Sequence, residues 1–140
     1  MLATGAVVVM LFAAVNFRGD LLRGWLRSDT ERIQGTWKTV SITKNGRARP
    51  DAGQVIFIFD GESLRAVKAP GDQTVSYHLD EGHQPGWIDI NDDRGLVQGI
   101  YEVSGATLRL CLNNKSSGKR PISFESKAGS GDSLWVLQRE

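Results

Sequence analysis

Cysteine and net charge are both scarce in this chain. One cysteine among 140 residues excludes an intrachain disulfide. The 17 Lys and Arg are almost balanced by 16 Asp and Glu, which leaves a formal charge of +1. A field this weak does not draw a protein to nucleic acid, which is held mainly through its phosphates. We therefore expect no nucleic-acid partner, and the length suits a single domain, which excludes a TIM barrel or a two-domain enzyme.

The motifs of common enzyme classes are also missing. The chain has no Gly-x-Ser-x-Gly sequence, no glycine-rich phosphate loop, and no histidine at a spacing that would activate Cys111. We expect Cys111 to be buried and inert, and we predict that the protein is not an enzyme. The catalytic alternative that the sequence leaves open is an inward-facing pair of an arginine with Asp89 or Tyr101.

The two histidines, His78 and His83, flank a short acidic stretch. Zinc needs three or four converging ligands, and Cys111 lies a strand away without a Cys-x-x-Cys partner. Residues 89–95 resemble the start of a calcium loop, but Arg94 stands where that loop requires glycine. We therefore expect solvated turns here, with no metal and no other cofactor.

An uncharged segment covers residues 2–17. As a helix it would be about 24 Å long, shorter than the roughly 30 Å hydrocarbon core of a bilayer. Residues 6–15 have the length of the apolar part of a signal peptide, although a basic start and a small-x-small cleavage site are missing.

Helical spacing continues behind this run, where apolar residues are interspersed with arginines. The apolar set is Phe17, Leu21, Leu22, Trp25 and Leu26. We predict an apolar and then amphipathic helix over residues 1–28. It would act as a signal peptide or membrane anchor, associate with the membrane through residues 2–27 and place the protein at the cell envelope. A helix docked on the domain and a cytoplasmic location stay open as alternatives.

From residue 29 onward the pattern is that of an all-β domain, which we place at residues 29–140. Ser28 and Glu31 predict a cap for one short helical turn. Short apolar and β-branched runs follow at 35–44, 54–59, 63–68, 74–79, 87–90, 96–103, 107–112, 122–125 and 134–138. Turn dipeptides such as Asn45-Gly46 separate them, and the connections are mostly too short for crossover helices. We predict a single antiparallel up-and-down barrel of about eight or nine strands.

One carboxylate in these strands needs a partner. In the run 87–90 we expect Asp89 to face inward, beside Trp87. A buried carboxylate requires an opposite charge, so we expect Arg65, Arg109 or Arg120 to lie next to it.

Two groups of motifs carry a resemblance to known proteins. Gly35-Thr36-Trp37 in the first strand and Arg139 in the last resemble the lipocalin-like (calycin) barrels, where such a tryptophan packs under a basic residue from near the C-terminus. The resemblance implies that Trp37 and Arg139 form a structural cap of the barrel, held by a cation–π contact.

The second group of motifs covers residues 30–140. It comprises Gly35-Thr36-Trp37-Lys38, Pro85-Gly86-Trp87-Ile88-Asp89, Gly99-Ile100-Tyr101, Leu108-Arg109-Leu110-Cys111, Arg120-Pro121-Ile122-Ser123-Phe124 and Leu137-Gln138-Arg139. In this order they resemble a family of small domains, of no assigned activity, that is abundant in planctomycete bacteria. The resemblance implies a lipocalin-like barrel that often follows an export signal.

A small barrel is either filled by its own side chains or hollow enough for one small ligand. We predict a monomeric binding protein for a small hydrophobic or amphipathic ligand at the cell envelope. The expected ligand-binding residues are Tyr77 and Tyr101, with Arg109 or Arg120 as the polar anchor. The alternative is a structural or protein-interaction module with a solid core and no cavity.

Overall fold

The computed structural model describes residues 27–68, 71–113 and 118–140. The helix predicted for residues 1–28, and with it the membrane segment 2–27, lies almost entirely outside these described residues. The chain divides into two units, Met1–Arg32 and Ile33–Glu140, and the second contains the barrel. Within the described ranges, no helix combines the length and the apolar character needed to cross a bilayer.

The first described element is the short helix α2, Asp29–Ile33. The Oγ of Ser28 accepts a hydrogen bond from the backbone N–H of Glu31 at 3.1 Å, and the Glu31 carboxylate accepts one from the N–H of Ser28 at 3.4 Å. This reciprocal pair satisfies backbone donors that the first helical turn leaves free. The helix cap predicted from the sequence is confirmed.

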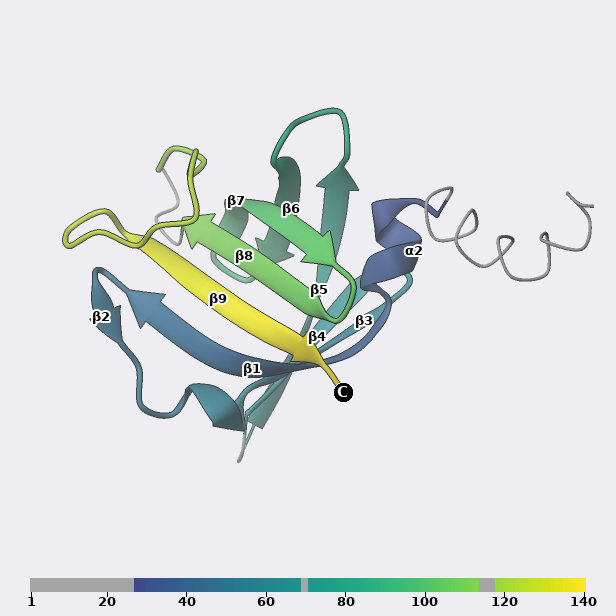
Figure 1. The fold of residues 1–140 in the computed structure, drawn as a ribbon, viewed down its shortest axis with the longest axis horizontal. Coiled ribbons are helices and arrows are strands. Elements are labelled where there is room, and N and C mark those ends of the chain that lie inside the picture. Colours follow the sequence, from purple (N-terminus) through teal and green to yellow (C-terminus); the bar gives the residue numbers. More distant parts are fainter. Residues whose placement is uncertain (1–26, 69–70, 114–117) are drawn as a thin grey trace, which may run out of the picture. The chain divides into compact units, whose positions relative to one another are not determined.

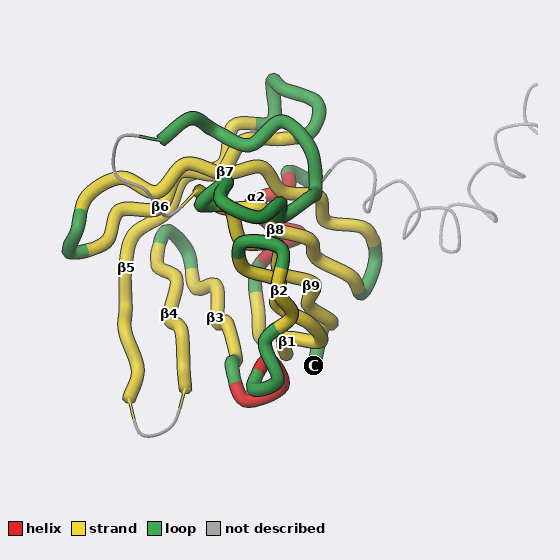
Figure 2. Tube along the Cα trace, turned by 90° about the vertical axis from the view of Figure 1, so that its left-hand side faces the viewer, coloured by secondary structure: helices red, strands yellow, loops and turns green. Residues whose placement is uncertain are grey.

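After α2, the described residues of the second unit form nine strands and one short 3-10 helix. They are β1 Gly35–Lys44, β2 Arg47–Ala48, η1 Ala52–Gln54, β3 Ile56–Asp60, β4 Ser63–Lys68, β5 Gly71–Asp80, β6 Gly86–Asp92, β7 Gly95–Ser104, β8 Thr107–Asn113 and β9 Asp132–Arg139. Strands β3 to β9 pair in chain order, and β1 pairs antiparallel with both β3 and β9. Figure 1 shows β9 beside β1, and Figure 2 shows β3, β4 and β5 side by side. The fold is therefore an eight-stranded, closed antiparallel barrel, with β2 as one extra strand on β1.

The turn signals in the sequence explain most of this meander. Asn45 and Gly46 have φ values of 50° and 79°, the left-handed backbone that a tight two-residue hairpin requires, and they connect β1 to β2. The predicted strand at residues 122–125 is wrong, because residues 118–131 form a loop between β8 and β9. Pro121 is buried, whereas Ile122 is 90% exposed, so apolar content here does not follow the pleat of a strand.

The alternation of side chains fills the barrel as expected from the sequence. On β5, Tyr77 and Leu79 are buried while their neighbours His78 and Asp80 are exposed. Inward-facing apolar side chains from every barrel strand form one core. Its largest fully buried members are Trp37, Tyr101, Phe59, Ile33, Ile88, Leu108, Leu110 and Leu137.

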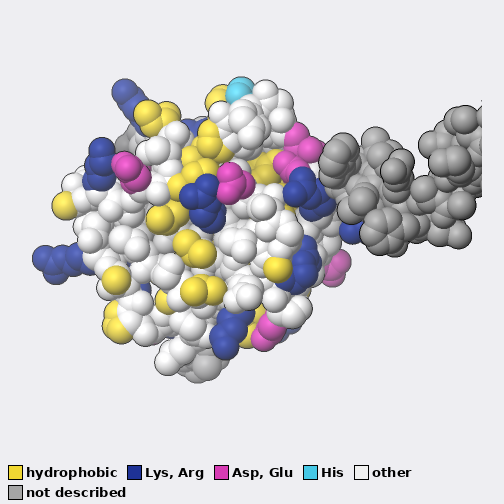
Figure 3. All heavy atoms as spheres, in the orientation of Figure 1, with side chains coloured by type: hydrophobic (Ala, Val, Ile, Leu, Met, Phe, Trp, Pro, Cys, Tyr) yellow, Lys and Arg dark blue, Asp and Glu magenta, His cyan; other side chains and the backbone are white. Residues whose placement is uncertain are grey.

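Charges of both signs are interspersed with apolar side chains on the face seen in Figure 3. This distribution agrees with the formal net charge of +1 for the whole chain.

Candidate functional site

A pocket of about 490 Å³ lies at the end of the barrel where β1, β4, β6 and β8 finish and β3, β5, β7 and β9 begin. Its volume is within the range of small-molecule sites. The apolar lining is formed by Ile42, Val55, Phe57, Leu64, Ala66, Val75, Ile90, Val97, Leu112 and Trp135. The barrel is thus packed at one end and hollow at the other.

Polar side chains surround the mouth of this pocket: Lys44, Arg49, Asp51, Lys68, Asp72, Gln73 and Asp92. Asp51, just before η1, lies 2.5 Å from the Nζ of Lys68 and 3.9 Å from the Nε of Arg49. The hydrogen bond from Lys68 is the main cause that lowers the pKa of Asp51. The Asp51 carboxylate therefore lies within ion-pair distance of both Lys68 and Arg49 on this side of the mouth.

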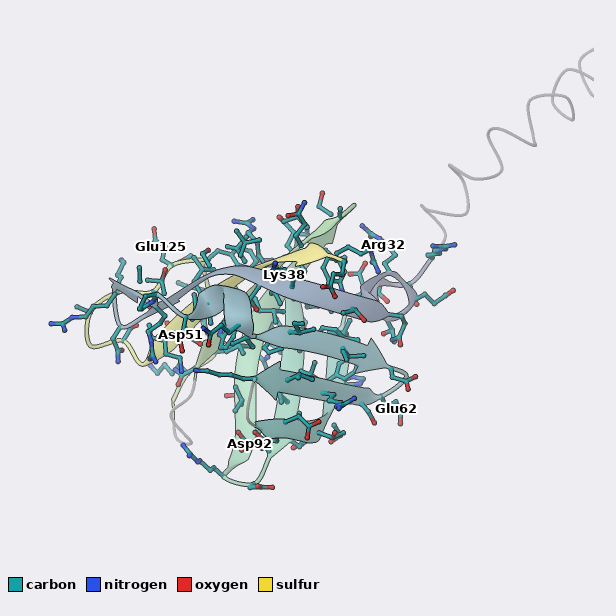
Figure 4. All side chains as sticks on the ribbon, turned by 90° about the horizontal axis from the view of Figure 1, so that it is seen from below. Arg32, Lys38, Asp51, Glu62, Asp92 and Glu125 are labelled. Atoms are coloured by element: carbon teal, nitrogen blue, oxygen red, sulfur yellow. The ribbon has the colours of Figure 1, made fainter. Side chains whose placement is uncertain are left out.

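The carboxylates on the far side of the mouth have other partners. Asp72, at the start of β5, is paired with Arg65 at 2.5 Å. Asp92, at the end of β6, accepts a hydrogen bond at 2.8 Å from the backbone N–H of Arg94 in the same turn. Figure 4 labels Asp51, just before η1, and Asp92, at the end of β6.

Lys44 is directed into the pocket by an irregularity in β1. Thr39 pairs with Leu137 and Ser41 with Val136, so Val40 is an extra residue in the strand. Such a bulge breaks the simple alternation of faces. Trp37 and Thr39 point inward before it, and Ile42 and Lys44 line the pocket after it.

The surroundings of Lys44 are partly apolar and partly cationic. Its Nζ lies 6.0 Å from the centroid of the Trp135 ring. Burial, followed by the positive charges of Arg49 and Lys68, lowers the pKa of Lys44 below its ordinary value, and Asp51 opposes this effect. Within the described ranges, no carboxylate lies within ion-pair distance of Lys44.

The sequence did not indicate this lysine. Trp37 faces the inside of the barrel. Regular alternation from Trp37 would place Lys44 on the opposite face, together with Lys38, which is exposed on the outside of β1. The bulge that reverses this assignment has no glycine or proline to mark it. The apolar and β-branched residues of the pocket were visible in the sequence only as strand interiors.

None of the four predicted ligand-binding residues lines this pocket. Tyr77 lies at the packed end, where its Oη donates to the carbonyl of Gly61 at 2.7 Å and accepts from the Nε2 of Gln34 at 2.9 Å. Burial raises the pKa of Tyr77. Tyr101 is 2% exposed, and its ring lies so close to Gly86 that a Cβ there would overlap it.

Arg109 and Arg120 lie on the outer face of the barrel and hold the loop 118–131. The Arg109 guanidinium is 2.8 Å from the Glu102 carboxylate and lies 4.1 Å from the centroid of the Phe124 ring. Arg120 belongs to the loop itself. The structure therefore does not bring the two arginines together with the two tyrosines, and their role in ligand binding stays an untested prediction.

Arg120 reaches from the loop to two barrel strands. Its Nη1 donates to the carbonyls of Ile88 at 3.2 Å and Gly99 at 2.9 Å, and its Nη2 donates to Asp89 at 2.8 Å. The guanidinium also lies 4.3 Å from the centroid of the Trp87 ring. The expectation that an arginine pairs with Asp89 is confirmed for Arg120.

The predicted orientation of Asp89 is wrong. Ile88 and Ile90 are buried in the core, so Asp89 and Trp87 alternate to the outside. Asp89 is still partly covered because the loop that carries Arg120 lies over it. The inward catalytic pair envisaged from the sequence therefore does not form at Asp89.

The packed end contains the contact expected between Trp37 and Arg139. The guanidinium of Arg139 lies 4.2 Å from the centroid of the Trp37 ring and donates to the carbonyl of Gln34 at 2.8 Å. The indole Nε1 of Trp37 donates to the carbonyl of Ile33 at 2.8 Å. The ring, which is 0% exposed, is thereby satisfied at its polar edge and covered on one face.

His78 belongs to β5, and His83 lies in the turn between β5 and β6. His78 is exposed on β5, and the ring of His83 stacks on Trp87 with a centroid distance of 3.4 Å. The Nε2 of His83 is 3.4 Å from the Asp80 carboxylate. In the ranges that the structure describes, no three Cys, His, Asp or Glu side chains are grouped as a metal site would require.

Cys111 is buried, as predicted, but outside the barrel lumen. It is 0% exposed on the outer face of β8, and its Sγ donates to the carbonyl of Glu125 in the loop at 3.5 Å. Burial raises the pKa of the Cys111 thiol to about 11. A thiol protonated to this extent is a poor nucleophile.

No family model, curated protein or solved structure matches the chain. The geometry defines the class instead: an eight-stranded antiparallel closed β-barrel, with an apolar pocket at one end and a mixed-charge mouth.

Proposed function

We propose that the protein is a non-catalytic carrier or sensor that binds one small amphipathic molecule in the pocket of its barrel. The observation that carries the proposal is the pocket of about 490 Å³, whose lining includes ten apolar side chains. At the roughly 30 Å³ that one water molecule occupies in the liquid, it has room for about 16 non-hydrogen atoms. A ligand of this size would bury its apolar part and leave its polar part at the mouth.

The proposal includes a lipocalin-like family relationship and a location at the cell envelope. Support for the relationship comes from Gly35-Thr36-Trp37 with Arg139, and from the ordered motifs of residues 30–140. Support for the location comes from the uncharged run of residues 2–17.

Binding can be tested with N-phenyl-1-naphthylamine, a neutral dye whose fluorescence rises in apolar surroundings. Ala66 faces the pocket from β4, and Val67 is its neighbour on the opposite face of the same strand. A66F should fill part of the pocket and reduce dye affinity about tenfold or more, whereas V67F should leave it unchanged. Circular dichroism of both variants establishes that they fold.

Two results would contradict the proposal. Either the unmodified chain does not bind the dye, or the dye binds equally well to A66F and V67F. The alternative function, a structural or protein-interaction module without a ligand, would then be favoured.

A further inference from the structure

The charges around the pocket mouth are unequally distributed. Three cations, Lys44, Arg49 and Lys68, act on one another at the side formed by β1, η1 and β4. Asp51 is the carboxylate whose charge reaches Lys44, and it is already paired with Lys68. The other charged groups that line the pocket, Asp72 and Asp92, have the partners described above. This side of the mouth therefore carries uncompensated positive charge beside an apolar wall.

Lys44 is the cation best placed to meet a ligand. Its side chain lines the pocket together with Ile42 and Trp135, its Nζ lies 6.0 Å from the centroid of the Trp135 ring, and part of it is removed from water. A half-buried ammonium without a carboxylate partner is costly, and an anion that binds beside it removes that cost. The apolar wall continues directly from this position into the barrel.

We infer that the ligand is a single-chain amphipathic carboxylate, whose headgroup binds Lys44 at the mouth and whose hydrocarbon part fills the apolar pocket. This inference rests on the proposed function and specifies its ligand. A monoanion matches Lys44, which has no carboxylate within ion-pair distance among the residues that the structure describes. A doubly charged phosphate would bring a second negative charge close to Asp51, so a carboxylate fits the site better.

The test compares three probes of equal chain length on the full chain, each below the concentration at which it aggregates or separates from water. They are dodecanoate, 1-dodecanol and dodecyltrimethylammonium, and each is titrated against the bound neutral dye. Dodecanoate has 14 non-hydrogen atoms, close to the roughly 16 that the pocket holds. We expect dodecanoate to bind about tenfold to a hundredfold more tightly than dodecanol, the range typical of a charge-assisted hydrogen bond. The ammonium probe should bind most weakly.

Two lysines on the same strand provide matched variants. K44M removes the charge inside the pocket, and K38M removes one from the outer face of β1, where Lys38 is labelled in Figure 4. K44M should bring dodecanoate to within about threefold of dodecanol and leave dodecanol affinity unchanged. K38M should bind all three probes like the unmodified chain, and K44R should keep the preference for dodecanoate.

The outcomes separate this inference from the proposed function. If dodecanol and dodecanoate bind equally well, the anionic headgroup is refuted while a ligand-binding pocket remains. If dodecanoate is preferred and K44M keeps that preference, Lys44 is not the anchor. If the dye does not bind the unmodified chain, the proposed function itself fails. The comparison among probes uses the unmodified chain, so it stands even if K44M does not fold.

Discussion

Replacement of Arg120 by methionine tests whether this residue belongs to a binding site or fastens the loop 118–131 to the barrel. The side chain of Arg120 is 13% exposed and that of Asp89 is 33% exposed. R120M removes three hydrogen bonds from a charged donor and the contact with Trp87, while methionine keeps part of the apolar stem. The variant therefore isolates the guanidinium.

The expected loss of stability lies between two limits. Surface ion pairs contribute about 0–1 kcal/mol, whereas breaking a fully buried pair costs about 3–5 kcal/mol. Because Asp89 keeps a third of its exposure and can be hydrated in the variant, we expect R120M to lower the free energy of unfolding by about 2–3 kcal/mol. The control is R65M, which breaks an ion pair whose side chains are 50% and 46% exposed, and which should cost about 1 kcal/mol or less.

Urea unfolding of the full chain, followed by circular dichroism, measures both values. Amide hydrogen exchange then shows whether the loop opens, because the backbone N–H groups of residues 118–131 should lose protection before those of the barrel strands. Dye affinity should be the same in R120M and in the unmodified chain. A cost no larger than that of R65M would refute the assignment of Arg120 as the fastening residue, and a selective loss of dye affinity would restore its predicted role as a ligand anchor.

Three further predictions concern other parts of the fold. G86A should lower the free energy of unfolding by about 1–3 kcal/mol in urea titrations, because the added Cβ overlaps the ring of Tyr101; a neutral effect would contradict this packing. R139A should cost about 1 kcal/mol through exposure of the Trp37 ring and leave dye affinity unchanged; an affinity loss without a stability loss would overturn its assignment as a cap. The Cys111 thiol should react with a disulfide reagent at pH 8 only as fast as the protein opens. Because its folded pKa is about 11 and its ordinary value 9.0, stability should fall as the pH rises from 9 toward 11, and C111A should show less of this decline.

The β-barrel was largely predictable because most of its strands alternate regularly and many are separated by turn dipeptides. Asn45-Gly46 and Asp60-Gly61 marked turns that the structure contains, and short connections left antiparallel pairing as the simplest arrangement. The loop 118–131 was harder to predict. Phe124 looks like a strand residue, but it packs against Arg109 on the outside of the barrel, a contact that depends on tertiary structure alone.

The site was less predictable, for two physical reasons. Alternation within residues 107–112 already placed Arg109 opposite the inward leucines, so an anchor role inside the cavity conflicted with the face assigned to it. Lys44 was hidden for the opposite reason, because one extra residue at Val40 changes the face of everything that follows in β1. A bulge is fixed by the pairing of β1 with β9, and no local residue type signals it.

Both ends of the barrel unit emerge on the side opposite the pocket. The unit starts at Ile33, which accepts a hydrogen bond from Trp37, and it finishes at Glu140, whose N–H donates to the carbonyl of Thr36 at 3.0 Å. Figure 1 marks the C-terminus at this packed end. A chip surface, bead or reporter domain attached through Glu140 would therefore leave the mouth open to solution. Ligand exchange could then be followed on an immobilised molecule without obstruction by its attachment.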